Sequence, residues 1–268
     1  MVSRFSIKLI ILYSLLCYQF QAFSKESKKR SLYYSLYSKF ETDFKEFDQN
    51  DKTLNLLAVL GLNYVINKKS SIGLNLPFLK SFSGKREFNY LDGSLSYNYQ
   101  FFNNRNNLSL KSYLSIALPY SKASREVNYL QTKLTFSPTL TYNLKDIKEL
   151  SLSLNTTFSK SFHRSNTNAF GSSNHSFIWS LSIGTNYLFK NKNSFNFKGS
   201  FLKMTTYGGF TKDNYSFEAT FSRPLTKKIN GTFGINNGGE VLDYNGDLNA
   251  KVFDINTSQI FISLSYSF

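Results

Sequence analysis

The sequence predicts an all-β fold, a transmembrane antiparallel up-and-down β-barrel of about twelve strands. Three observations lead to this prediction. Apolar and polar residues alternate along most segments, the connections between segments alternate in length, and aromatic residues gather beside the short connections. Because successive side chains of a strand point to opposite faces, a period of two gives each strand one apolar and one polar face.

The alternation is clear in segment 107–119. Leucine and isoleucine occupy one face there, whereas Ser109, Lys111, Tyr113 and Ser115 occupy the other. The same reading along the chain predicts strands at 31–39, 53–66, 71–80, 88–102, 108–120, 127–144, 149–162, 174–189, 194–207, 213–225, 229–238 and 255–268.

The connections between these segments differ in length in a regular way. Short ones fall at 67–70, 103–107, 145–148, 190–193 and 226–228, and longer ones at 40–52, 81–87, 121–126, 163–173 and 239–254. The short connection at 208–212 is the exception. Bacterial transmembrane barrels have short periplasmic turns and longer external loops, so an even strand number places both termini in the periplasm.

Aromatic residues near the short turns and the C-terminus all fall on the apolar faces of their strands. A ring of such residues is typical of the membrane interface, where amphipathic rings are favoured. The residues are Tyr64, Tyr99, Phe101, Tyr142, Tyr187, Phe189, Phe195, Phe197, Tyr266 and Phe268. A soluble barrel is the alternative, but Ser, Asn and Thr on the opposite faces favour a wet interior.

The N-terminus has the features of a secretory signal peptide. Arg4 and Lys8 precede an apolar run from Leu9 to Phe20, and small residues at Ala22 and Ser24 predict cleavage after residue 24. Residues 25–268 would then form a single barrel domain. The net charge of +15 would suggest nucleic acid for an intracellular protein, but export points instead to anionic lipid and lipopolysaccharide.

The last strand ends in an aromatic residue, with apolar residues at alternate positions before it. These residues are Ile260, Ile262, Leu264, Tyr266 and Phe268. The segment resembles the C-terminal assembly signal of outer-membrane β-barrel proteins of Gram-negative bacteria. The resemblance implies residence in the outer membrane and recognition by the barrel-assembly machinery.

The polar faces carry a small set of charges inside the strands, and these are the candidate pore-lining residues. They are Asp92, Lys111, Lys133, Lys198 and Glu218. A pore with excess lysine would favour anionic solutes. Lys198 and Glu218 are equidistant from Gly208, so they would also face each other as an ion pair that fixes strand register.

Two acidic loops, 40–52 and 239–254, would lie beside each other where the barrel closes. In the second loop, Asp243, Asn245, Asp247 and Asp254 match the ligand positions of a calcium-binding loop. Leu248 stands where such a loop needs glycine, and Asp- and Asn-rich segments also form ordinary turns. We expect no cofactor, with calcium as the alternative.

Residues 222–228 and 239–245 are similar to the last hairpin of the outer-membrane phospholipase A family. That resemblance implies a His-x-Ser pair, which His163 and Ser165 supply. The pair departs from the family because fewer strands follow it and because strand parity points His163 inward. A passive channel for small solutes is therefore the first hypothesis, an outer-membrane enzyme the second, and a structural or surface-binding barrel the third.

Overall fold

A computed structural model describes residues 32–45, 52–84, 86–105, 107–145, 147, 149–242 and 248–268. The predicted signal peptide lies outside these residues. The strands of the described part are β1 (Leu32–Asp43), β2 (Leu54–Asn67), β3 (Ser70–Ser81), β4 (Phe88–Tyr90), β5 (Gly93–Arg105), β6 (Leu108–Leu118), β7 (Leu130–Asn143), β8 (Leu150–His163), β9 (His175–Leu188), β10 (Ser194–Thr206), β11 (Thr211–Pro224), β12 (Ile229–Glu240) and β13 (Gln259–Ser267).

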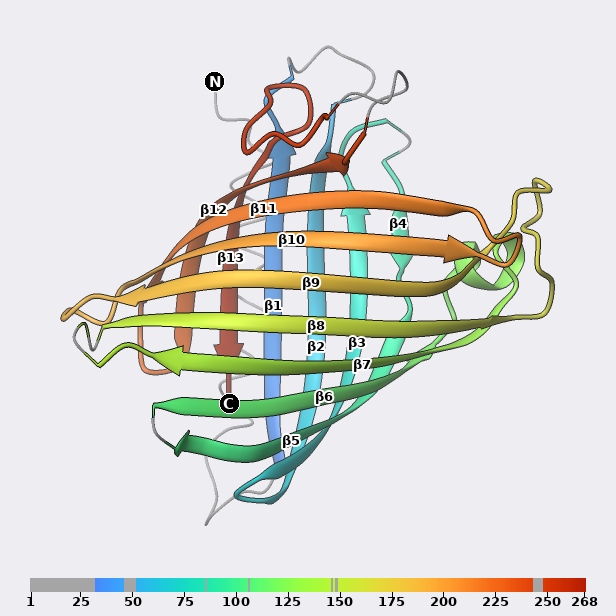
Figure 1. Cartoon of the computed structure of the whole chain (residues 1–268). Helices are drawn as coiled ribbons and strands as arrows, with labels where there is room; N and C mark the ends of the chain where they lie inside the picture. Colours follow the sequence, from blue (N-terminus) through green and yellow to red (C-terminus); the bar gives the residue numbers. More distant parts are fainter. Residues whose placement is uncertain are drawn as a thin grey trace.

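The strands form one closed antiparallel barrel (Figure 1). When β4 is left out, each strand pairs with the strand before it and the strand after it in the chain. The barrel closes because β1 pairs with both β2 and β13. The wall therefore has twelve strands, and β4 is a short extra strand beside β3. This confirms the predicted all-β, up-and-down barrel. Among the described residues, no helix is long and apolar enough to span a membrane.

The two faces of the wall differ as the alternation predicts. Large apolar side chains are exposed on the outside, whereas many of the described buried residues are serines. Seven of the ten predicted girdle residues are exposed, namely Tyr64, Phe101, Tyr142, Tyr187, Phe189, Phe195 and Phe197. Tyr266 is buried instead, with its ring centroid 4.1 Å from that of Phe268.

The two ends of the barrel also differ. The short-turn end carries the β2–β3, β5–β6, β7–β8, β9–β10 and β11–β12 connections, and the C-terminus lies there (Figure 1). The long-loop end carries the other connections, including the short β10–β11 turn. One long connection, predicted as a plain loop, contains a turn of π-helix, η1 (Ala123–Val127).

One predicted strand is interrupted. Residues 88–102 were expected to run unbroken, but the structure divides them into β4 and β5. The cause is a change of partner by β3, which pairs with β5 through Ser70–Asn75 and with β4 through Phe78–Lys80. Residues 91–92 belong to neither strand, and the Leu91 amide donates to the carbonyl of Pro77 at 3.1 Å.

Candidate functional site: the barrel interior

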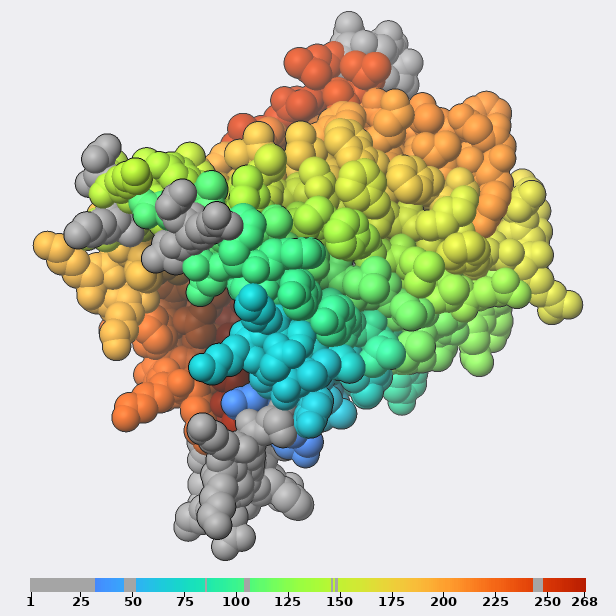
Figure 2. Space-filling view, turned by 60° about the horizontal axis from the view of Figure 1, so that its bottom comes forward, coloured from blue at the N-terminus to red at the C-terminus, as the bar shows by residue number. Residues whose placement is uncertain are grey.

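The interior is lined by small polar side chains, and two of the cavities between the described residues lie along one part of it. The larger has a volume of about 530 Å³ and lies toward the short-turn end, between β2, β3, β5, β6 and β7. The smaller, of about 210 Å³, lies toward the long-loop end against β5, β6 and β7. Figure 2 shows the short-turn end, where a recess opens between the β5–β6 turn (green) and the β11–β12 turn (orange). Both cavities lie against the part of the barrel formed by β5, β6 and β7, which we call the β5–β7 wall.

Two predicted pore residues are the lysines of this wall. Lys111 on β6 is exposed and lines the larger cavity, whereas Lys133 on β7 is half-buried and lines the smaller one. No carboxylate of the described residues forms an ion pair with either lysine. The other lining groups are mostly hydroxyls and amides. Asp92 is the one carboxylate of the described residues that lines either cavity, beside Lys133, so the positive charge is concentrated around Lys111.

The part of the barrel wall formed by β10 and β11 carries less net charge than the β5–β7 wall. Lys198 on β10 and Glu218 on β11 are direct register partners, so the predicted alignment of these two residues is confirmed. Both side chains are exposed to the interior, and no ion pair joins their charged groups. The two opposite charges on neighbouring strands still offset each other for a solute at a distance.

A further ion pair on the inner face was missed from the sequence. Lys39 and Glu41 on β1 form an ion pair of 2.6 Å, and the Lys39 Nζ lies 4.3 Å from the centroid of the buried Phe261 ring. Glu41 was assigned to an outer loop because strand one was expected to end at residue 39. The alternation that continues through Phe40 and Thr42 could have revealed the longer strand.

Asp92 lies in the two-residue link between β4 and β5, not within a strand as expected. Its carboxylate accepts hydrogen bonds from the Ser121 amide at 3.0 Å and from the Ser124 hydroxyl, and these bonds join the β4–β5 link to the η1 connection. Burial, and then the negative charge of Asp92, raises the pKa of Tyr120. Asp92 therefore lines the smaller cavity and also fixes its outer rim.

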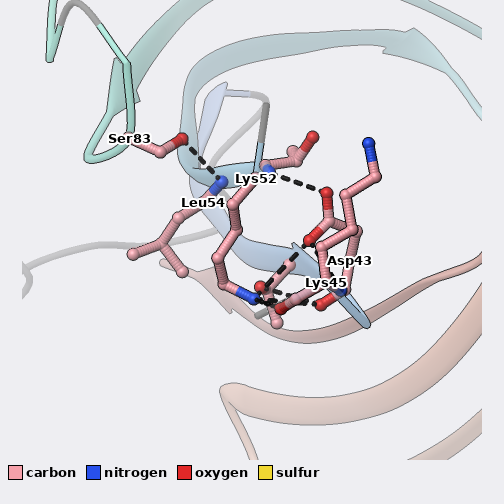
Figure 3. A network of polar contacts seen from close by, with 7 residues as sticks. Asp43, Lys45, Lys52, Leu54 and Ser83 are labelled. Atoms are coloured by element: carbon pink, nitrogen blue, oxygen red, sulfur yellow. Dashed lines mark hydrogen bonds and ion pairs between the residues drawn. The ribbon is translucent and has the colours of Figure 1, made fainter. Parts of the chain in front are cut away.

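The predicted acidic loop 40–52 begins inside the barrel wall, because β1 extends to Asp43. Lys52 lies 3.5 Å from Asp43, and both side chains are buried (Figure 3). The Asp43 carboxylate also accepts from the Thr53 amide at 2.7 Å, and the Leu54 amide donates to Ser83 at 3.2 Å. These contacts close the base of the β1–β2 loop and tie it to the next long connection.

The candidate catalytic pair has other partners in the structure. The His163 Nδ1 lies 3.4 Å from the Tyr207 hydroxyl, which itself donates to the carbonyl of Ser161 at 2.8 Å. The Ser165 hydroxyl lies 3.3 Å from that of Thr167. Within the described residues no hydrogen bond joins His163 to Ser165, so the geometry offers no activated serine there.

Three of the four candidate calcium ligands lie outside the part of the chain that the structure describes. They are Asp243, Asn245 and Asp247. Asp254 is described, and its carboxylate accepts from Lys251 at 2.9 Å and from the Asn256 amide at 2.9 Å. These bonds lower the pKa of Asp254. No group of three or more possible metal ligands occurs among the residues described.

No family model matches the sequence, and no curated protein matches it. Solved structures of similar shape exist. The COG4313 outer membrane channel from Pseudomonas putida F1 has a TM-score of 0.64 at 12% identity, covering 91% of this chain and 97% of the other. The KdgM porin in complex with disordered oligogalacturonate has a TM-score of 0.55 at 9% identity, with coverages of 87% and 99%. The NanC porin has a TM-score of 0.54 at 10% identity, with coverages of 88% and 98%. At such identities the likeness shows the barrel fold alone.

Proposed function

We propose that this barrel is a passive channel of the outer membrane that admits small anionic solutes. The observation that carries the proposal is the placement of Lys111 and Lys133. Both lie on the inner face, both line a cavity, and neither forms an ion pair with a described carboxylate. A charge inside a narrow wet lumen acts on a passing ion more strongly than one on an open surface.

The outer face supports a membrane location. Its exposed apolar side chains would be unfavourable in water over so large an area, whereas lipid would cover them. Aromatic pairs such as Tyr99–Phe101 and Tyr187–Phe189, each with centroids 4.9 Å apart, lie toward the short-turn end. This arrangement suits an interface girdle, with the short-turn end and the C-terminus in the periplasm.

The structurally similar proteins agree with a transport role. The three that we compare are a channel and two porins, and one of them was solved with an oligogalacturonate. Outer-membrane lipid and lipopolysaccharide would surround the barrel, and the assembly machinery would read its last strand. We propose a channel in preference to a phospholipase because His163 and Ser165 bond to other residues.

Replacing Lys111 with glutamine should weaken the preference for anions. At about 4 Å a unit charge contributes about 1 kcal/mol even at the dielectric constant of water. The anion-to-cation permeability ratio should therefore fall by up to roughly fivefold, as measured by the reversal potential of single channels in a salt gradient. Lys203→Gln is the matched control, since Lys203 lies on the outer face opposite Trp179. Equal effects of the two substitutions would contradict the proposed role of the inner wall.

A further inference from the structure

We propose that the β5–β7 wall holds an anion site on the short-turn side of Tyr113 and a nearly neutral cavity beyond it, and that this side chain sets the size of solute that passes. The inference rests on the proposed channel function and deepens it. Tyr113 lines both cavities, with the larger on one side of it and the smaller on the other. Any solute that moves along this wall from one cavity to the other must therefore pass its ring.

The Tyr113 side chain extends further into the barrel interior than the side chains beside it. Its register partners are Asn98 on β5 and Ser137 on β7, and the next strand places Thr157 beside Ser137, with 2.9 Å between the two hydroxyls. All three are shorter than tyrosine. The Tyr113 ring is half-buried, and its hydroxyl has no hydrogen-bond partner among the described residues. It can therefore contact a solute without losing an internal bond.

The two cavities differ in the charge of the residues that line them. The larger cavity is lined by Lys68, Lys69 and Lys111, and no carboxylate of the described residues lines it. Lys133 in the smaller cavity is accompanied by Asp92, so the charges there nearly cancel. Lys111 is two residues from Tyr113 along β6, a distance of about 7 Å. An anion should therefore rest in the larger cavity, directly on the short-turn side of the tyrosine ring.

The remaining lining indicates the class of anion. Hydroxyl and amide groups from Asn98, Gln100, Ser137 and Thr139 surround Lys111. The Asn155 amide donates to the hydroxyls of Ser137 at 2.9 Å and Thr139 at 2.7 Å, which holds these hydroxyls in place. Lysine binds a carboxylate, and fixed hydroxyls bind other hydroxyls. A small carboxylate that carries several hydroxyl groups fits both requirements.

The test uses gluconate, a hydroxylated carboxylate, against chloride. The gluconate-to-chloride permeability ratio is measured from reversal potentials of the full chain in planar bilayers under bi-ionic conditions. Tyr113→Ala should raise this ratio several-fold, whereas Tyr113→Trp should lower it. Tyr113→Phe should leave it unchanged, because the phenylalanine ring fills nearly the same space.

Tyr37→Ala is the matched control, because Tyr37 pairs with Ser265 on the same inward face but lines neither cavity. That control should retain the wild-type ratio. An anion-selective channel whose gluconate ratio is the same in the Ala, Trp and wild-type proteins would overturn the role of Tyr113 and leave the channel function standing. Complete lack of conductance in the folded wild type would overturn both.

Discussion

Deletion of Phe268 should abolish assembly, leaving most of the protein degraded or aggregated in the periplasm. The residue ends the segment that resembles the assembly signal, and the structure adds a second reason. Its amide donates to the Tyr34 carbonyl at 3.0 Å across the β1–β13 seam, and its ring lies 4.1 Å from that of Tyr266. Fractionation of outer-membrane and periplasmic protein measures the effect.

The control for this deletion is Phe268→Tyr, which keeps both the terminal ring and the main-chain bond. We expect it to reach the outer membrane in normal yield. If the deleted chain also reached the membrane at the wild-type level and resisted denaturation by detergent, the assembly role of the terminal residue would be wrong.

Arginine at Leu114 should lower the free energy of unfolding in lipid by about 2–4 kcal/mol, the cost of a cation near the bilayer midplane. Leu114 lies near the middle of β6 and is 46% exposed, between Tyr97 and Phe136 on the outer face. Urea unfolding in phospholipid vesicles measures the change.

Arginine at the next residue, Ser115, provides the comparison. Ser115 points inward and lines the smaller cavity, which has room for a longer side chain. We expect a much smaller loss of stability for Ser115→Arg. Equal losses for the two variants would show that the inner and outer faces have been assigned wrongly.

The fold could be predicted largely because a strand with one face in lipid and the other in water must alternate. Segment 107–119 shows the pattern almost without interruption, and β6 lies there. One failure occurs where a tertiary contact overrides the pattern, because Asp92 bonds to the η1 connection and the predicted strand is interrupted there. The other is the end of the first strand, where the alternation itself continues through Phe40 and Thr42 and β1 extends to Asp43.

The candidate site could be predicted only in part. Parity placed Lys111 and Lys133 on the polar face, and both line the interior. Whether a lysine has an acidic neighbour on another strand depends on segments far apart in the chain, so the open position of Lys111 was not accessible from the sequence. The pair Lys39 and Glu41 lies within one strand and was missed because that strand was ended too early. The alternation in segment 107–119 placed Tyr113 on the polar face. Its position between two cavities depends on the packing of several strands and is visible only in the structure.

The most direct test of the channel is the reversal potential of the purified wild-type protein in a planar bilayer with a salt gradient. We expect discrete conductance steps and a reversal potential of the sign that anion selectivity gives. The selectivity should fade as salt rises, because screening shortens the reach of Lys111 and Lys133. Absence of conductance at every salt concentration, or selectivity for cations, would contradict the proposed function.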